Sequence, residues 1–156
     1  MSHPNEDNFE FGVIQDSLGQ SMGTAIPTRA LMLVCGGIGS GKSIIGQRMA
    51  FGMTENDVRV ALYTTELTTR GWLEQVASIG YYMDKRIDEG SFHLISSFGV
   101  IAEQSTEPVT VLDLLETPPS RDAEVVINDR ASELMPPEVG GKELLSRLRK
   151  FTSEGR

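Results

Sequence analysis

The pattern of apolar residues divides this chain into short β-type runs that alternate with helical stripes. Unbroken apolar or β-branched runs predict strands at 30–35, 58–65, 92–96 and 125–128. Apolar residues that recur every three or four positions predict helices over 44–53, 72–79, 112–115 and 144–151. Strands that alternate with helices indicate an α/β fold with a mainly parallel sheet flanked by helices.

The chain length and the character of its ends suggest a single domain. At 156 residues the chain can bury one hydrophobic core. We expect a flexible N-terminus over residues 1–15, which are polar and uneven, and one domain over residues 16–156. The chain begins with acidic residues instead of a basic signal-peptide start, and no apolar run could span a bilayer, so we expect a soluble intracellular protein.

The net charge, the two histidines and the single cysteine limit the kinds of ligand that the chain could bind. The formal net charge is −8, and a surface of that sign repels nucleic acid, so no nucleic-acid partner is expected. His3 and His93 stand far apart without cysteine partners, which disfavours a metal site made of side chains alone. The single cysteine, Cys35, ends the first apolar run, where we expect it to pack in the core.

Glycines concentrate directly after the first predicted strand. The sequence GGIGSGKS fits the P-loop pattern G-x-x-x-x-G-K-S and comprises Gly36, Gly37, Ile38, Gly39, Ser40, Gly41, Lys42 and Ser43. In such a loop, backbone N–H groups surround a phosphate at the N-terminus of a helix, the lysine reaches the β- and γ-phosphates, and the serine hydroxyl holds Mg²⁺. A structural glycine turn is the alternative, but the flanking strand and helix patterns favour a site for ATP and Mg²⁺.

Two acidic residues follow predicted strands. Asp129 closes the run at 125–128, as the acid of a Walker B strand does, and we predict that it holds Mg²⁺; a capping or turn aspartate is the alternative. Glu66 follows the run at 58–65. Because ligands of α/β sheets lie beyond the carboxyl ends of the strands, Glu66 is the candidate catalytic residue that positions water. The alternative for Glu66 is a solvated loop acid.

These residues resemble those of the RecA-like P-loop ATPases, and within them the KaiC-like branch. The segments IPTRALMLVCGGIGSGKSIIGQRMAFG and YTTELTTRGWLEQVASIGYYM resemble the archaellum accessory ATP-binding proteins most closely. The resemblance implies a RecA-like P-loop NTPase core that binds ATP and Mg²⁺ with weak or no hydrolysis. It also implies a homo-oligomeric ring, and the archaellum motor ATPase and membrane-associated archaellum components as partners. The implied location is the cytoplasm, at the inner face of the membrane through those partners.

The chain departs from the family pattern at three points. The entry to the first strand, residues 23–30, lacks several of the family's glycines, and Arg130 follows Asp129 where the family tends to have serine. The resemblance also implies C-terminal strands that this chain lacks, one of them between the strands at 30–35 and 125–128. We therefore expect unpaired strand edges and a chain that is marginally stable, prone to aggregate or dependent on a partner.

Two other functions are compatible with the sequence. One is an active KaiC-like or RecA-like ATPase that acts on another partner such as DNA. The other is a truncated interaction module that no longer binds nucleotide.

Overall fold

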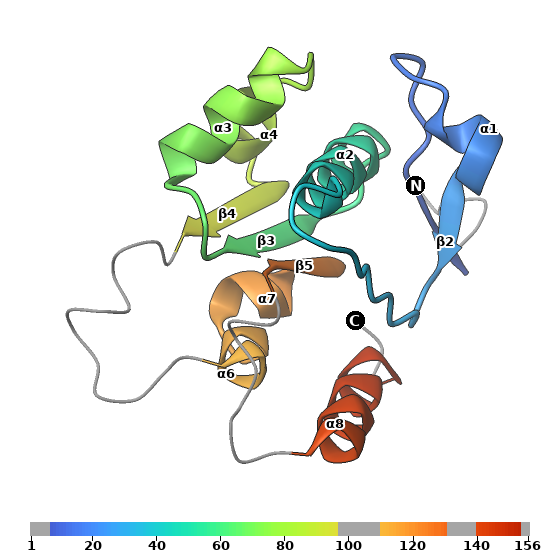
Figure 1. The fold of residues 1–156 in the computed structure, drawn as a ribbon, viewed down its shortest axis with the longest axis vertical. Coiled ribbons are helices and arrows are strands. Elements are labelled where there is room, and N and C mark those ends of the chain that lie inside the picture. Colours follow the sequence, from blue (N-terminus) through green and yellow to red (C-terminus); the bar gives the residue numbers. More distant parts are fainter. Residues whose placement is uncertain (1–6, 97–109, 131–139, 154–156) are drawn as a thin grey trace.

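The computed structural model describes residues 7–96, 110–130 and 140–153, and Figure 1 shows how they are arranged. The elements are β1 (Asn8–Glu10), α1 (Leu18–Met22), β2 (Ala25–Pro27), α2 (Lys42–Glu55), β3 (Val60–Thr64), α3 (Thr69–Ser78), α4 (Asp84–Asp88), β4 (Phe92–Ser96), α6 (Val111–Leu115), α7 (Pro118–Asp122), β5 (Val125–Asp129) and α8 (Gly141–Ser153). The predicted α/β fold is confirmed.

The central sheet has the strand order β4-β3-β5, and both pairings are parallel. Every residue of β3 is buried, because this strand has a neighbour on each edge and helices over each face. In the register of the sheet, Thr64 lies opposite Ser96 of β4 and Asp129 of β5. The three strands therefore end together, and the residues that follow them share one edge.

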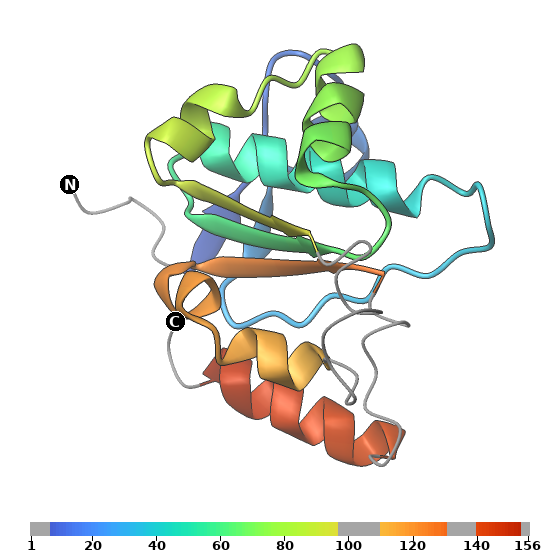
Figure 2. The same cartoon turned by 90° about the vertical axis from the view of Figure 1, so that its left-hand side faces the viewer.

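Helices cover the two faces of the sheet, so the molecule has three layers (Figure 2). On one face, α2, α3 and α4 enclose the main core, in which Trp72 is fully buried and packs against Phe92 with ring centroids 5.3 Å apart. On the other face, Ala61 and Tyr63 pack with Ala123 beside α7. Helix α8 joins this face through α6, where Leu144 packs with the α6 leucines.

The N-terminal residues that the structure describes form a strand and packing contacts, where we expected a flexible end over residues 1–15. Residues 8–10 form β1, which pairs with β2 in antiparallel orientation, and Phe11 is 1% exposed. Arg48 of α2 donates to the Phe11 carbonyl at 2.9 Å and forms an ion pair with Asp16. Residues 8–11 thus take part in a strand and in contacts with α2, and the flexibility of the N-terminus stays a prediction.

The strand predicted at 30–35 does not form. Residues 30–40 are exposed, and the apolar side chains of Leu31, Met32, Leu33 and Val34 are 41%, 47%, 74% and 45% exposed. Cys35 is also exposed, so its predicted place in the core is wrong. A β-strand is stabilised by backbone hydrogen bonds to a neighbour. Within the described part of the chain, residues 30–35 pair with no strand.

The segment TPPSRDA starts a helix that the apolar pattern did not predict. Thr110 and Asp113 form a capping box at the start of α6. Helix α7 then begins directly at Pro118, because proline is tolerated in the first turn, where its missing N–H needs no partner. No helix in the described ranges is long and apolar enough to cross a membrane.

Candidate phosphate-binding site

The glycine loop lies beyond the carboxyl ends of the strands and leads directly into α2 (Figure 2). Gly39 and Gly41 have φ angles of 77° and 91°, which other residues rarely adopt. A β-carbon at Gly36 would collide with the Ser40 hydroxyl. Glycines at these positions therefore shape the loop, while the side chain of Ile38 is 99% exposed.

Lys42 is the first residue of α2, and its side chain folds back over the loop. Its Nζ donates to the carbonyl oxygens of Gly36 at 2.6 Å and Gly37 at 2.8 Å. A lysine ammonium has three donors, so these two bonds leave one for an anion. The N-terminus of α2 adds its partial positive charge at the same place. The loop, Lys42 and the helix end thus offer donors and positive charge together.

Ser43 and Asp129, the two predicted metal ligands, are 86 residues apart in sequence and in direct contact in the structure. Ser43 Oγ donates to Asp129 Oδ1 at 3.1 Å. The contact arises because α2 crosses β5: a β-carbon at Gly46 would lie 3.7 Å from the Ile127 side chain. The fold thus brings the P-loop helix to the end of the strand that carries the acid.

The environment of Asp129 suits a cation. Burial raises the pKa of the Asp129 carboxyl, the hydrogen bond from Ser43 lowers it, and the nearby charge of Glu66 raises it again. A divalent cation would offset the cost of burying this charge. In the described residues, no three His, Cys, Asp or Glu side chains gather to form a metal site. A magnesium ion here would thus depend on Ser43, Asp129 and the phosphates of the nucleotide.

Glu66 lies at the same strand edge, two residues after the end of β3. Its Oε1 forms an ion pair with Nε of Arg130, the residue that follows Asp129. The charges of Glu66, Arg130 and Lys42 all influence the pKa of Asp129, so these groups lie within one electrostatic neighbourhood. The structure therefore brings Glu66, Lys42, Ser43 and Asp129 together.

The contact of Arg130 with Glu66 was not predicted from the sequence. Arg130 stood out only as a departure from the family pattern. The strand register would have indicated this contact. Asp129 lies opposite Thr64, so the residues that follow the two strands must be close neighbours.

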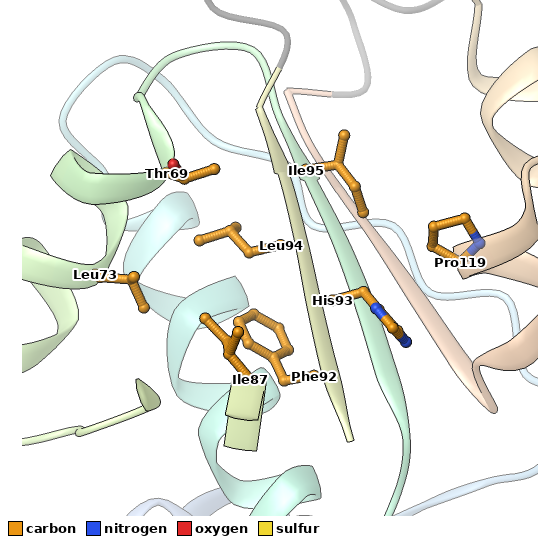
Figure 3. A pocket seen from close by; sticks show the side chains of 8 residues that line it. All are labelled: Thr69, Leu73, Ile87, Phe92, His93, Leu94, Ile95 and Pro119. Atoms are coloured by element: carbon orange, nitrogen blue, oxygen red, sulfur yellow. The ribbon is translucent and has the colours of Figure 1, made fainter. Parts of the chain in front are cut away.

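A separate apolar pocket of about 360 Å³ lies along β4, an outer strand of the sheet (Figure 3). It is lined by Thr69, Leu73, Ile87, Phe92, His93, Leu94, Ile95 and Pro119. None of these residues belongs to the glycine loop or its neighbours. The pocket is thus distinct from the candidate phosphate site.

Comparison with known proteins agrees with this geometry. The family profile described as "ATPase: KaiC" matches residues 16–125, which include the whole glycine loop and Glu66. This chain belongs to the KaiC family of ATPases. The resemblance stated from the sequence is confirmed at this level, and within the KaiC family two curated relatives are similar over most of the chain.

Both curated relatives are named archaeal flagellar ATP-binding protein FlaH. The protein from Methanocaldococcus jannaschii is 28% identical over 142 residues, which cover 89% of this KaiC-family chain and 61% of the relative. The protein from Methanococcus voltae is 24% identical and is covered to 62%. The chain thus spans about three fifths of the length of these relatives.

A solved structure has the same fold. The crystal structure of the flagellar accessory protein FlaH from M. jannaschii superposes with a TM-score of 0.82 at 25% identity, over 96% of this chain and 67% of that one. The RecA-like architecture expected from the sequence is confirmed by this similarity, and the KaiC-family chain is shorter than the solved protein.

Proposed function

We propose that this chain binds Mg–ATP and serves as a regulatory or scaffold subunit of the archaeal motility machinery, with weak or no hydrolysis. The contact between Ser43 and Asp129 is the observation that carries nucleotide binding. A glycine turn without a ligand gives no reason for a hydroxyl and a half-buried carboxylate to meet at the start of α2. The names of the two relatives, which describe ATP-binding proteins, support the same ligand.

Each residue of the site has one role in this proposal. The backbone of residues 36–41 and the Lys42 ammonium hold the phosphates, and Ser43 and Asp129 hold Mg²⁺. The bound ion neutralises charge on the phosphate oxygens. Glu66 positions the water in any hydrolysis that takes place.

The partners are proposed from the relatives. Their names place them in the archaeal flagellum, so we propose the archaellum motor ATPase and membrane-associated archaellum components as partners, and a homo-oligomeric ring. The proposed location is the cytoplasm, at the inner face of the membrane through those partners. Nucleic acid is not among the proposed partners, because the net charge of −8 repels it.

Calorimetric titration of ATP with Mg²⁺ into the full chain and its Lys42→Ala variant tests this proposal. We expect the variant to lose roughly ten- to a hundredfold in affinity, because charge-assisted hydrogen bonds to phosphate are lost. Lys85→Ala is the matched control, since Lys85 is 80% exposed on α4 and pairs only with its helix neighbour Glu89 among the ion pairs described. An unchanged dissociation constant in Lys42→Ala would remove the P-loop assignment. A wild-type chain that binds no ATP would favour the interaction module.

An active ATPase that works on another partner, such as DNA, is the second candidate. The position of Glu66 at the same strand edge as Asp129 favours it, because hydrolysis needs a carboxylate beside the metal site. Phosphate release that DNA accelerates would support this candidate. In that case Glu66→Gln should bind ATP normally and lose turnover, because an amide cannot act as a base.

A further inference from the structure

An ion pair joins Glu66 and Arg130, which lie beyond the ends of two neighbouring strands. Nε of Arg130 contacts Oε1 of Glu66, and the two side chains are 44% and 30% exposed. Arg130 directly follows β5 and Glu66 lies two residues after β3, and these two strands end in register, with Thr64 opposite Asp129. The backbone N–H of Thr65 donates to the Asp129 carbonyl at 3.0 Å, which continues the pairing past the strand ends. Backbone hydrogen bonds between the two strands therefore fix the relative position of the segments that carry the ion pair.

We propose that Arg130 is a positioning residue that holds Glu66 in an unproductive orientation and so keeps nucleotide turnover slow. This inference rests on the proposed function, in which the site binds Mg–ATP. A carboxylate that positions water must lie within hydrogen-bond distance of that water. Glu66 instead directs one of its oxygens to a guanidinium, so the ion pair must break or rotate before this oxygen can serve the reaction.

The free energy needed to break the ion pair between Arg130 and Glu66 determines how much turnover should rise when the pair is removed. Ion pairs that are partly open to solvent contribute little, because water and side-chain entropy offset their attraction. Arg130 therefore restrains Glu66 and does not block it. Removal of the guanidinium should raise turnover by about two- to fivefold, the range that corresponds to such pairs.

The positions of the surrounding charges favour this role over direct phosphate binding. Lys42 already provides the ammonium that lies over the loop carbonyls of Gly36 and Gly37. The loop and the N-terminus of α2 provide the other donors for an anion. Arg130, directly after the end of β5, pairs with the candidate water-positioning acid instead.

The test combines turnover and binding in four variants of the full chain. Phosphate release from Mg–ATP and calorimetric ATP affinity are measured for Arg130→Ser, Arg130→Gln, Arg130→Lys and the double variant Glu66→Gln with Arg130→Ser. Arg70→Ser is the matched control, because Arg70 is 89% exposed on α3 and pairs with Glu74 away from the site. Trp72 fluorescence during heating shows that each variant is folded, since this single tryptophan is fully buried.

We expect both neutral variants to raise kcat about two- to fivefold with unchanged ATP affinity. Arg130→Lys should stay near the wild-type rate, because it keeps the charge. The double variant should show no gain, since the released group is no longer a carboxylate.

Three results would overturn the inference. They are an unchanged or lower kcat in both neutral variants, a lower ATP affinity in both, or an equal gain in the double variant. If instead the wild-type chain bound no ATP, the proposed function itself would fail.

Discussion

Two apolar runs of similar composition differ in burial and in secondary structure. In the run at Val60–Thr64 every residue is buried, whereas the run at 30–35 is exposed along its whole length. The first run becomes β3, which has strands on both edges and helices on both faces. The second has no pairing partner in the part of the chain that the structure describes. The comparison teaches that neighbours decide whether an apolar run becomes a strand.

The residues that stabilise the fold and the residues that we propose to bind a ligand also lie in different regions. The buried region contains α2, α3, β3 and β4. The contacts of Arg48 with Phe11 and Asp16 connect the N-terminal region to it. The exposed region contains residues 30–40, most of the glycine loop among them. Loops that bind ligands commonly have few buried contacts and depend on a rigid scaffold for their position. Substitutions in the two regions should therefore affect different measurements.

The sharpest test exchanges leucine for alanine in each apolar run. Leu62 in β3 is 1% exposed and Leu33 is 74% exposed. Leu62→Ala should lower the free energy of unfolding by about 2–5 kcal/mol, because a buried side chain leaves a cavity. Leu33→Ala should change it by less than about 0.5 kcal/mol. Urea unfolding followed by Trp72 fluorescence measures both, and equal losses would mean that residues 30–35 are buried in solution.

Two glycines of α2 provide a second test, within the buried region. A β-carbon at Gly52 would collide with the Phe11 carbonyl and the Arg48 guanidinium, whereas one at Gly46 would make an ordinary contact with Ile127. Gly52→Ala should therefore destabilise the protein by about 1–3 kcal/mol. Gly46→Ala should be neutral or stabilise it by up to about 1 kcal/mol, because alanine favours helices. If thermal unfolding showed no difference between the two, the packing of Phe11 on α2 would be wrong.

The smallest effect concerns pH and the Asp16 network. The hydrogen bond from Arg48 holds the pKa of Asp16 at about 2, below its usual 3.8, although partial burial acts in the opposite direction. A depressed pKa stabilises the fold above pH 3.8 and loses this contribution as the pH falls toward 2. Asp16→Asn should thus cost about 1–2 kcal/mol at neutral pH and almost nothing near pH 2.

Denaturant unfolding at several pH values measures this difference. Asp88→Asn, on the exposed surface of α4, is the matched control. A constant difference between Asp16→Asn and wild type across the acid range would contradict the assignment of the network.

Local signals predicted much of the fold. The strand at 92–96, the helix over 112–115 and the acid at the end of β5 all depend on residues that are close in sequence, and the structure has each of them. The P-loop and Walker B motifs also predict that Ser43 and Asp129 hold one metal ion, and the structure places the two side chains in contact.

Features that depend on distant partners could not be predicted. The strands β1 and β2 have three residues each and exist through their pairing with one another. The buried Arg48 depends on Asp16, which lies 32 residues earlier. The exposure of residues 30–35 depends on tertiary packing, which no property of the run itself reveals. The pair of Glu66 with Arg130 depends on which strands are neighbours and on their register, because the two residues are far apart in sequence.

The exposed thiol of Cys35 makes this protein convenient to study by labelling. It is the single cysteine of the chain and directly precedes Gly36. A maleimide dye would therefore attach at one known position, next to the loop that we propose to hold phosphates. Its emission would report ligand binding in real time, while the buried tryptophan reports unfolding in the same sample without any engineered substitution.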